Sequence, residues 1–252
     1  MNLVQTFLGL ILVVMSAALM LVYSLPKFRK SRRVFRQIPA LQHLRRAIGR
    51  SVEEGGRIHV SIGKSSIFSP TNASALVGLS TTDRIAQFSL VSDRPPIVTS
   101  GDGTLAILSQ DTLRLAYRIA NASEQYDPER GRLTGSTPFS YIAGTMPVIR
   151  SERVSTNVFL GNFGPEVALL VDAADRQNAF ALAASDALAA QAVLYATTKE
   201  SLIGEELFAI PAYLQAGPIY QASLNIQDIL RWVVIGLLIA GALLSVLVVS
   251  IQ

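Results

Sequence analysis

Residues 57–74 read RIHVSIGKSSIFSPTNAS, and this stretch sets the folding pattern of the chain. Apolar and polar side chains alternate over 57–62, which is the period of a β-strand with one face in a core. The alternation ends at a turn, and residues 69–72 then offer groups that can cap a helix. A helical pattern continues to about residue 90. We therefore predict a strand, a turn and a helix in succession.

The rest of the domain repeats this alternation. Further strands are predicted over 95–100, 139–146, 155–160 and 178–184, and helices over 104–119, 186–197 and 200–208. The polar segment 124–137 contains proline and glycine and is predicted to be an exposed loop. Strands separated by helices of this length are typical of βα units. The predicted fold class is therefore α/β, with covering helices on a mostly parallel sheet.

Two long runs without a charged residue lie at the chain ends, at residues 7–25 and 233–251. Each run has 19 residues, about the length that a helix needs to cross a ~30 Å hydrocarbon core. A cleaved signal peptide carries its positive charge before the apolar run, whereas here no Lys or Arg precedes Lys27. We therefore expect two retained transmembrane helices. The predicted parts are transmembrane helix 1–25, a basic connector helix 26–56, an α/β domain 57–225 and transmembrane helix 230–252.

A basic cluster directly follows the first apolar run. It consists of Lys27, Arg29, Lys30, Arg32, Arg33 and Arg36. Positive residues that flank a span stay on the cytoplasmic side. We therefore expect a two-pass protein of the cell (inner) membrane, with residues 26–230 in the cytoplasm and both termini outside. The same side chains are expected to contact anionic lipid headgroups of the bilayer.

The charge distribution limits the kinds of partner that the domain can bind. Nine of the 22 basic residues and none of the 18 acidic residues lie before residue 53, which leaves 22 − 9 = 13 basic residues against 18 acidic ones. Nucleic-acid binding is not expected, because it requires a basic surface on the domain itself. The chain has no Cys, which excludes disulfides, thiolate nucleophiles and Cys-based metal sites. We expect no cofactor.

The connector contains an amphipathic pattern over residues 33–52. Apolar residues recur at helical spacing at Ile38, Leu41, Leu44 and Ile48. Pro39 interrupts this pattern, so a kink or a restart of the helix is expected there. The helix is interpreted as a connector that lies on the membrane or packs against the domain, with partner binding as the alternative.

The turn after the first strand, Gly63-Lys64-Ser65, has the Gly-Lys-Ser sequence of a phosphate-binding loop. That loop also requires a glycine five positions before the glycine of this motif, and Ile58 occupies that position. A nucleotide loop of this kind is therefore excluded. Lys64, Ser65 and Ser66 still follow a strand at the edge where α/β sheets bind ligands. Binding of a small anion there is one hypothesis, and a plain turn before a capped helix is the other.

A second candidate turn consists of Gly101, Asp102, Gly103 and Thr104, directly before a predicted helix. A helix N-terminus attracts anions, but the Asp102 carboxylate repels a phosphate. Asp102 either binds a divalent cation or caps the helix, and capping is the expected role. The turn at 161–166 is similar, but Glu166 itself occupies the position of an anion and is interpreted as structural.

No constellation of catalytic residues is evident in the sequence. The two histidines are His43, in the connector, and His59, which is interpreted as a packed or edge-strand residue. Asp172 and Asp175 form a lone acidic pair, which is typical of a solvated helix face rather than a metal site. The apolar runs carry no charge that could relay protons or ions. Small residues in these runs permit close helix contacts, so we expect assembly into an oligomer.

Residues 56–79 and 93–104, together with the turn at 161–166, resemble a family of uncharacterised bacterial two-pass membrane proteins with a cytoplasmic domain of unknown function. The resemblance covers most of the domain. It implies a membrane location and supplies no catalytic residue.

Three functional hypotheses follow. The favoured one is a non-enzymatic, homo-oligomeric membrane scaffold or assembly subunit that displays an α/β domain at the cytoplasmic face. The alternative is a membrane-tethered sensor that binds a small anionic ligand or nucleotide at the strand-to-helix turns. The third is a metal-dependent hydrolase or transferase at the same edge.

Overall fold

The computed structural model describes residues 3–24, 36–70, 72–90, 92 and 94–251. The chain divides into two compact units, residues 36–216 and a unit formed by residues 1–35 and 217–252. Each unit is described separately. The basic residues Lys27, Arg29, Lys30, Arg32 and Arg33 lie outside the described residues.

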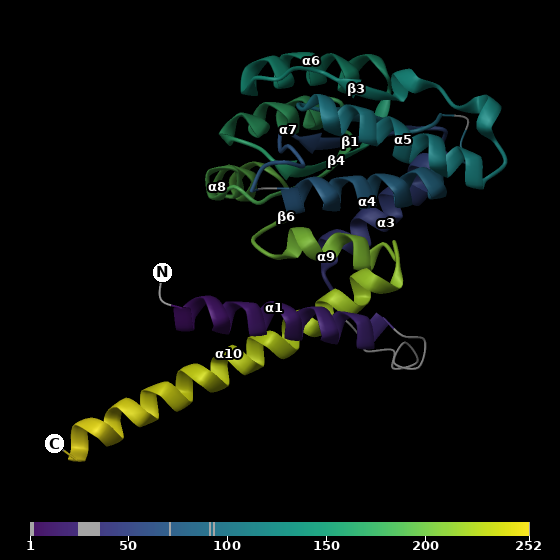
Figure 1. The fold of residues 1–252 in the computed structure, drawn as a ribbon. Helices are drawn as coiled ribbons and strands as arrows, with labels where there is room; N and C mark the ends of the chain where they lie inside the picture. The colour runs from purple at the N-terminus through teal and green to yellow at the C-terminus, as the bar shows by residue number, and fades with distance from the viewer. Residues whose placement is uncertain (1–2, 25–35, 71, 91, 93, 252) are drawn as a thin grey trace. The chain divides into compact units, whose positions relative to one another are not determined.

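The unit of residues 36–216 contains a six-stranded parallel sheet (Figure 1). Its strands are β1 (Arg57–Gly63), β2 (Ile97–Ser100), β3 (Gly131–Leu133), β4 (Val154–Asn162), β5 (Phe180–Ser185) and β6 (Glu200–Leu202). Their order in the sheet is β3-β2-β1-β4-β5-β6, and every neighbouring pair is parallel. From β1 the chain adds β2 and then β3 on one side. It then crosses to the other side of β1 and adds β4, β5 and β6 in turn. The predicted α/β class with a parallel sheet is confirmed.

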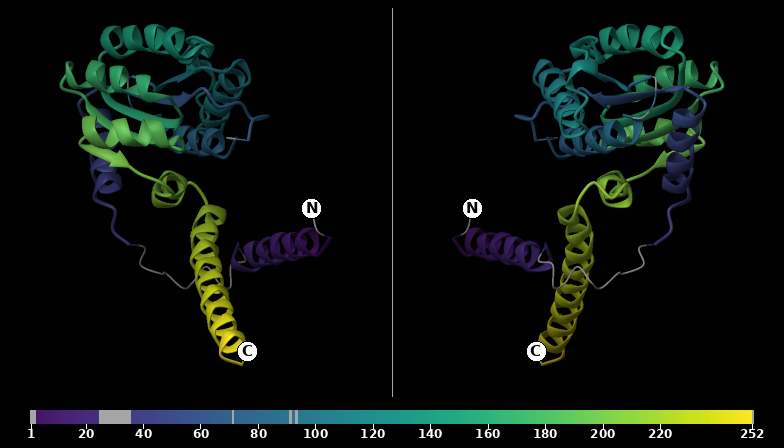
Figure 2. Two further views of the ribbon diagram at one scale, coloured as in Figure 1. Left: turned by 90° about the vertical axis from the view of Figure 1, so that its left-hand side faces the viewer. Right: turned by 90° about the vertical axis from the view of Figure 1, so that its right-hand side faces the viewer.

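Helices connect successive strands and cover both faces of the sheet (Figure 2). They are α3 (Pro39–Glu53), α4 (Asn72–Ser89), α5 (Gly103–Ile119), α6 (Pro138–Ser151), α7 (Ala168–Asp175), α8 (Leu188–Thr197) and α9 (Glu206–Tyr213). Short 3-10 helices lie at η1 (Ser123–Gln125), η2 (Pro128–Arg130) and η3 (Pro165–Val167). Pro39 stands in the first turn of α3, where a missing N–H costs nothing, so the helix begins there.

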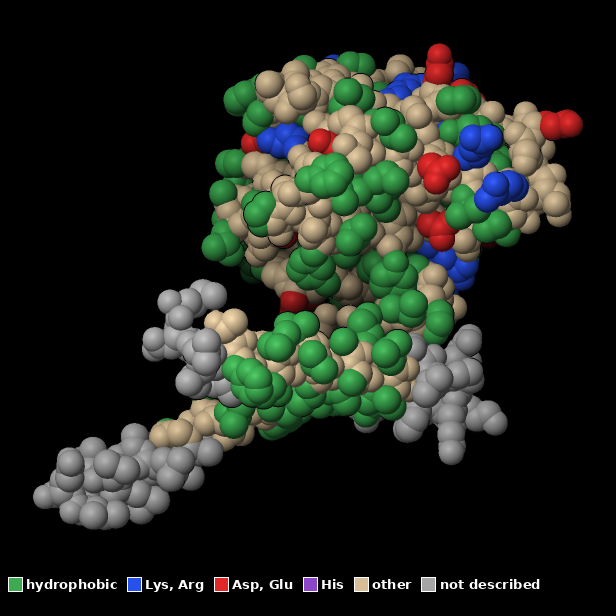
Figure 3. Space-filling model, in the orientation of Figure 1, with side chains coloured by type: hydrophobic (Ala, Val, Ile, Leu, Met, Phe, Trp, Pro, Cys, Tyr) green, Lys and Arg blue, Asp and Glu red, His purple; other side chains and the backbone are tan. Residues whose placement is uncertain are grey.

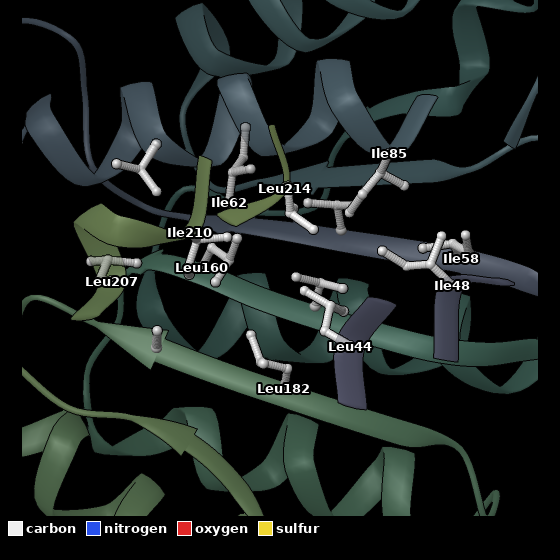
Figure 4. Packing of buried hydrophobic residues seen from close by; sticks show 14 of the residues in the cluster. Leu44, Ile48, Ile58, Ile62, Ile85, Leu160, Leu182, Leu207, Ile210 and Leu214 are labelled. Carbon is white, nitrogen blue, oxygen red and sulfur yellow. The ribbon is translucent and has the colours of Figure 1, made fainter. Parts of the chain in front are cut away.

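One apolar core lies between the sheet and helices α3, α4, α5 and α9 (Figure 4). Alternate residues of β1 enter it, among them Ile58 and Ile62. They meet Leu44 of α3, Ile85 of α4 and Ile210 of α9, and all five side chains are buried. The amphipathic connector helix therefore packs against the sheet, as one of its two interpretations predicted.

A second apolar core lies on the opposite face, under α6, α7 and α8. Phe159 of β4 and Ala183 of β5 enter this core, whereas their sequence neighbours enter the first one. They pack with Tyr141 of α6, Leu170 of α7 and Leu194 of α8. The period of two along each strand thus divides the apolar residues between two faces.

The predicted strand over residues 139–146 is wrong, because these residues belong to helix α6. Thr137 caps the helix by accepting a hydrogen bond from the Ser140 backbone N–H, and Ser140 Oγ accepts one from the Thr137 N–H. Pro138 fills the first helical position, where its fixed φ favours a helix. These local signals outweigh the short apolar alternation that suggested a strand.

Two short edge strands also differ from the predictions. The segment predicted as a loop contains β3, and the segment predicted as a helix over 200–208 begins with β6 before α9 starts. Both strands have three residues and lie at opposite edges of the sheet. A segment of three residues is too short to show a periodic pattern, so alternation cannot reveal it.

The second unit contains two helices that contact each other, α1 (Leu3–Ser24) and α10 (Pro218–Ile251). Within the described residues, one segment is long and apolar enough to cross a membrane by length and composition, residues 218–239. The apolar part of α1, residues 9–23, is shorter. Green apolar side chains lie along the described part of α1, with tan atoms between them (Figure 3). The two-pass arrangement remains a prediction.

Candidate functional site

The turns after the central strands meet at the carboxyl edge of the sheet. The backbone N–H of Lys64, after β1, donates to the carbonyl of Asn162 at the end of β4, over 3.0 Å. The N–H of Gly101, after β2, donates to the carbonyl of Gly63 over 2.8 Å. Open α/β sheets bind ligands outside the carboxyl ends of the strands, at the point where the strand order reverses. That point lies here between β1 and β4.

Glycines permit the close approach of these strand ends. Gly63 has a φ of +71°, and a Cβ placed on it would lie 2.6 Å from the carbonyl oxygen of Asn162. Gly161 has a φ of +144°, and its Cβ would lie 2.3 Å from the carbonyl oxygen of Ile62. Any other residue at either position would be strained and would push β1 and β4 apart. The glycines therefore belong to the architecture of the edge.

An ion pair joins the turns after β1 and β4. Lys64 Nζ lies 3.2 Å from Glu166 Oε1, and their side chains are 18% and 11% exposed. Glu166 Oε1 also accepts a hydrogen bond from the Gly164 backbone N–H. Burial favours the neutral carboxyl, but backbone hydrogen bonds and the hydrogen bond and charge of Lys64 outweigh it, so the pKa of Glu166 is lowered. The cation predicted to receive an anionic ligand is therefore neutralised by a side chain of the same domain.

The other predicted ligand-binding residues have mostly structural surroundings. Ser65 is buried, and its hydroxyl has no hydrogen-bond partner among the described residues. The Ser66 hydroxyl accepts from the Phe68 N–H over 3.4 Å. Asp102 caps α5 by accepting from the Leu105 N–H, which confirms its expected role. Gly103 and Thr104 follow as the first residues of α5.

The structure brings two of the predicted ligand-binding turns, at Lys64 and at Gly101, into contact. A Cβ on Gly101 would lie 2.5 Å from the Lys64 side chain, so the first and second candidate turns touch. The Asp102 carboxylate is engaged by its own helix instead. Among the residues that the structure describes, no group of three or more His, Cys, Asp or Glu is arranged to hold a metal ion.

A buried polar layer lies behind this edge, between the central strands and α6. The ring of His59 in β1 is hydrogen-bonded through Nδ1 to Asn157 Oδ1 (3.0 Å) and through Nε2 to Thr99 Oγ1 (2.9 Å). The Tyr141 hydroxyl lies 2.6 Å from Ser61 Oγ and is also hydrogen-bonded to the Thr99 backbone carbonyl. These contacts connect three strands to the helix. His59 is therefore a packed residue, one of its two predicted roles.

The polar layer is poorly placed for proton transfer. Burial lowers the pKa of His59 to about 4, although the hydrogen bond to Asn157 favours the charged ring and the charge of Arg132 opposes it. Burial likewise raises the pKa of Tyr141, against hydrogen bonds that favour its ionised form. Both groups are neutral near pH 7 and sealed from solvent. The sequence could have indicated that these polar residues lie inside the protein, because His59 and Ser61 alternate with Ile58, Val60 and Ile62 along β1.

The fold defines a class of protein, a doubly wound parallel α/β domain whose chain also carries a long apolar helix. The chain belongs to the family of the domain of unknown function DUF6754, whose family model matches residues 1–252. Comparison with curated proteins and with solved structures gives no match. The family assignment agrees with the expected resemblance to an uncharacterised family. The bacterial and membrane parts of that resemblance remain predictions.

Proposed function

We propose that the protein is a non-enzymatic two-pass membrane scaffold or assembly subunit that forms homo-oligomers and displays its α/β domain at the cytoplasmic membrane face. The observation that carries this proposal is the apolar surface of α10. Trp232, Leu237 and Leu238 are 73%, 66% and 69% exposed within the chain. Apolar side chains of this size need a nonaqueous environment, which a bilayer or a second copy of the helix supplies.

The ends of the chain support the membrane part of the proposal. Helix α1 is rich in exposed apolar side chains, including Phe7, Leu10 and Leu21, and it contacts α10. The basic residues at 27–33 follow α1 in sequence and favour retention of this side in the cytoplasm. Arg36, also assigned to headgroup contact, is largely exposed but forms an ion pair with Glu206 over 3.3 Å.

The carboxyl edge supports a role without catalysis. Lys64 and Glu166 satisfy each other there, and Asp102 is engaged in capping. His59 is buried and neutral, so it offers no accessible base. Structural roles thus account for Lys64, Glu166, Asp102 and His59.

Chemical labelling tests the membrane topology. Because the native chain has no Cys, a single cysteine can be introduced at position 2 or at Glu124, an exposed position in the short 3-10 helix η1. In intact cells a membrane-impermeant maleimide should label the cysteine at position 2 and leave the Glu124→Cys variant unlabelled until the cells are opened. Labelling of Glu124→Cys in intact cells would overturn the orientation. Recovery of the unmodified chain in the soluble fraction would overturn the membrane assignment.

Binding of a small anionic ligand or nucleotide at the carboxyl edge is the second candidate function. It is favoured by the reversal of strand order between β1 and β4 and by the convergence of the turns there. Such a ligand would have to displace Glu166 from Lys64. Glu166→Gln should therefore increase the thermal shift caused by a binding nucleotide, and Lys64→Ala should abolish it. Equal shifts in both variants would place the ligand elsewhere.

A further inference from the structure

A cavity of about 670 Å³ lies at the amino edge of the sheet, opposite the turns described above. Its wall includes Val154 at the start of β4, Phe180 at the start of β5 and Glu200 at the start of β6. Helix α3 and the C-terminal ends of α6 and α7 supply the remaining sides. This volume is within the range of cavities that bind small molecules in proteins.

Four arginines from two distant parts of the sequence line this cavity: Arg46, Arg50, Arg150 and Arg153. Within the described residues none of the four forms an ion pair. The cavity wall also contains two carboxylates, Glu54 and Glu200. Glu200 is hydrogen-bonded to His43, whose Nδ1 lies 2.6 Å from Glu200 Oε1. The cavity therefore has an excess of positive charge.

Local helix electrostatics explains only part of this arrangement. Arg50 and Arg150 lie in the last turns of α3 and α6, where a cation favourably meets the helix dipole. Arg46 lies four residues before Arg50, however, and like charges at this spacing destabilise a helix. Arg153 adds a fourth positive charge to the same cavity. All four arginines are exposed, so their guanidinium groups are open to a ligand in the cavity.

Arg153 also adopts an unfavourable backbone conformation. It follows the C-terminal cap of α6 with a φ of +52°, a position that usually belongs to Gly or Asn. By contrast, Asn178 adopts the same φ at the end of α7, on the wall of the same cavity. An arginine at such a position is costly for the backbone, which points to a role for its side chain.

Three hydroxyl groups in the wall are hydrogen-bonded to one another. Ser51 Oγ lies 2.8 Å from Thr156 Oγ1, and Ser155 Oγ donates to Ser51 Oγ over 2.8 Å. All three residues line the cavity beside the arginines. Ser51 and Thr156 are buried and the hydroxyl groups are already engaged, so an anion must be held by the guanidinium groups. Guanidinium groups bind phosphate oxygens through paired, charge-assisted hydrogen bonds.

We propose that this cavity binds a phosphate monoester through Arg46, Arg50, Arg150 and Arg153. The group is carried either by a soluble phosphorylated metabolite or by the headgroup of a phospholipid. This site is separate from the carboxyl edge, and the inference does not rest on the proposed scaffold function.

The test uses the detergent-solubilised full chain at low salt, where charge interactions are least screened. Isothermal titration calorimetry compares glycerol 3-phosphate with dihexanoyl phosphatidic acid at concentrations below its micelle formation. At least one of them should bind to the unmodified protein. Binding of the soluble ester identifies a metabolite site, and binding of the lipid alone identifies a headgroup site. Failure of both to bind would overturn the proposal.

Arg153→Gly is the decisive variant, because glycine suits the positive φ and should leave the melting temperature unchanged or raise it. Loss of its charge-assisted hydrogen bonds should still weaken binding by roughly tenfold to a hundredfold. Arg50→Gln should act in the same direction. Arg114→Gln is the matched control, because Arg114 is an exposed arginine of α5 outside the cavity. Equal affinity in the unmodified, Arg153→Gly and Arg50→Gln proteins would overturn the site.

Discussion

Lys64 and Glu166 form an ion pair that connects the turn after β1 to the turn after β4, with Nζ and Oε1 3.2 Å apart. Both side chains are largely buried, so each charge depends on the other for compensation. The pair lies where the strand order reverses, the usual ligand position in such sheets. In this protein an ion pair therefore connects β3-β2-β1 to β4-β5-β6 at the usual ligand position.

Removing one partner of this pair should destabilise the domain. We expect Lys64→Met and Glu166→Gln each to lower the free energy of unfolding by about 1–3 kcal/mol, because a partly buried charged group loses its partner. Denaturant unfolding measures this loss. The double variant should lose less than the sum of the two single losses. Strict additivity would contradict an energetic link between the two side chains.

The lowered pKa of Glu166 predicts a loss of stability in acid. The folded-state pKa of Glu166 lies below its ordinary value of 4.5. The ionised carboxylate is therefore more favoured in the folded protein than in the unfolded chain. This contribution is present above pH 4.5 and disappears as the pH falls through the folded-state pKa. Unfolding curves at successive pH values should show this loss in the unmodified protein and not in Glu166→Gln. An identical acid dependence in both proteins would exclude this contribution.

His59 predicts a second acid effect at higher pH. Its pKa is about 4 in the folded protein and 6.5 ordinarily, so between these values the unfolded chain binds more protons. Stability should fall by roughly 3 kcal/mol as the pH decreases from 6.5 to about 4. In His59→Gln the absolute stability is lower, but this part of the pH slope should be absent. A slope of the same size in the variant would show that other groups cause it and would contradict a lowered pKa of His59 in the folded state.

The glycine at the end of β1 should be intolerant of a side chain. Gly63→Ala places a Cβ 2.6 Å from the Asn162 carbonyl oxygen at a positive φ, so we expect a loss of about 2–3 kcal/mol. Gly103→Ala is the control, since no atom outside its chain neighbours and its own helix backbone lies within 4 Å of its Cβ position. It should change the free energy of unfolding by less than about 0.5 kcal/mol. Similar losses in both variants would mean that contact with Asn162 is not the cause.

A charge in the apolar helix should prevent membrane insertion. Leu238→Arg places a guanidinium in the apolar part of α10, at a cost of about 3 kcal/mol when the segment enters a bilayer. The variant should shift toward the soluble or aggregated fraction when cells are fractionated. Leu115→Arg is the control, because Leu115 is an exposed residue of α5. Equal membrane recovery of both variants would count against α10 as a span.

The sequence predicted those elements whose periodicity extends over enough residues. Strand β1 and helix α5 were predicted within a few residues of their observed bounds. The apolar alternation over residues 139–146 predicted a strand wrongly, because the capping residues around Thr137 favour a helix there. Strands β3 and β6 have three residues each and pair only at the edges of a sheet that other segments build. Such strands depend on tertiary pairing more than on local sequence.

Among the site residues, roles that depend on local sequence could be predicted, and contacts between distant segments could not. Asp102 is a helix cap because of its own position before α5, so the sequence could predict its role. The pairing of Lys64 with Glu166 joins residues about 100 positions apart and requires the strand order. The arginine cavity likewise combines α3 with the end of α6. No spacing in the sequence indicates that Arg50 and Arg153 share a cavity.

The central claim is that the chain assembles with copies of itself in a membrane environment. Multi-angle light scattering of the detergent-solubilised full chain, corrected for bound detergent, measures the protein mass of the particle directly. We predict a constant mass that is an integer multiple, greater than one, of 27.1 kDa across a wide range of protein concentrations. A mass of 27.1 kDa at every concentration would contradict it.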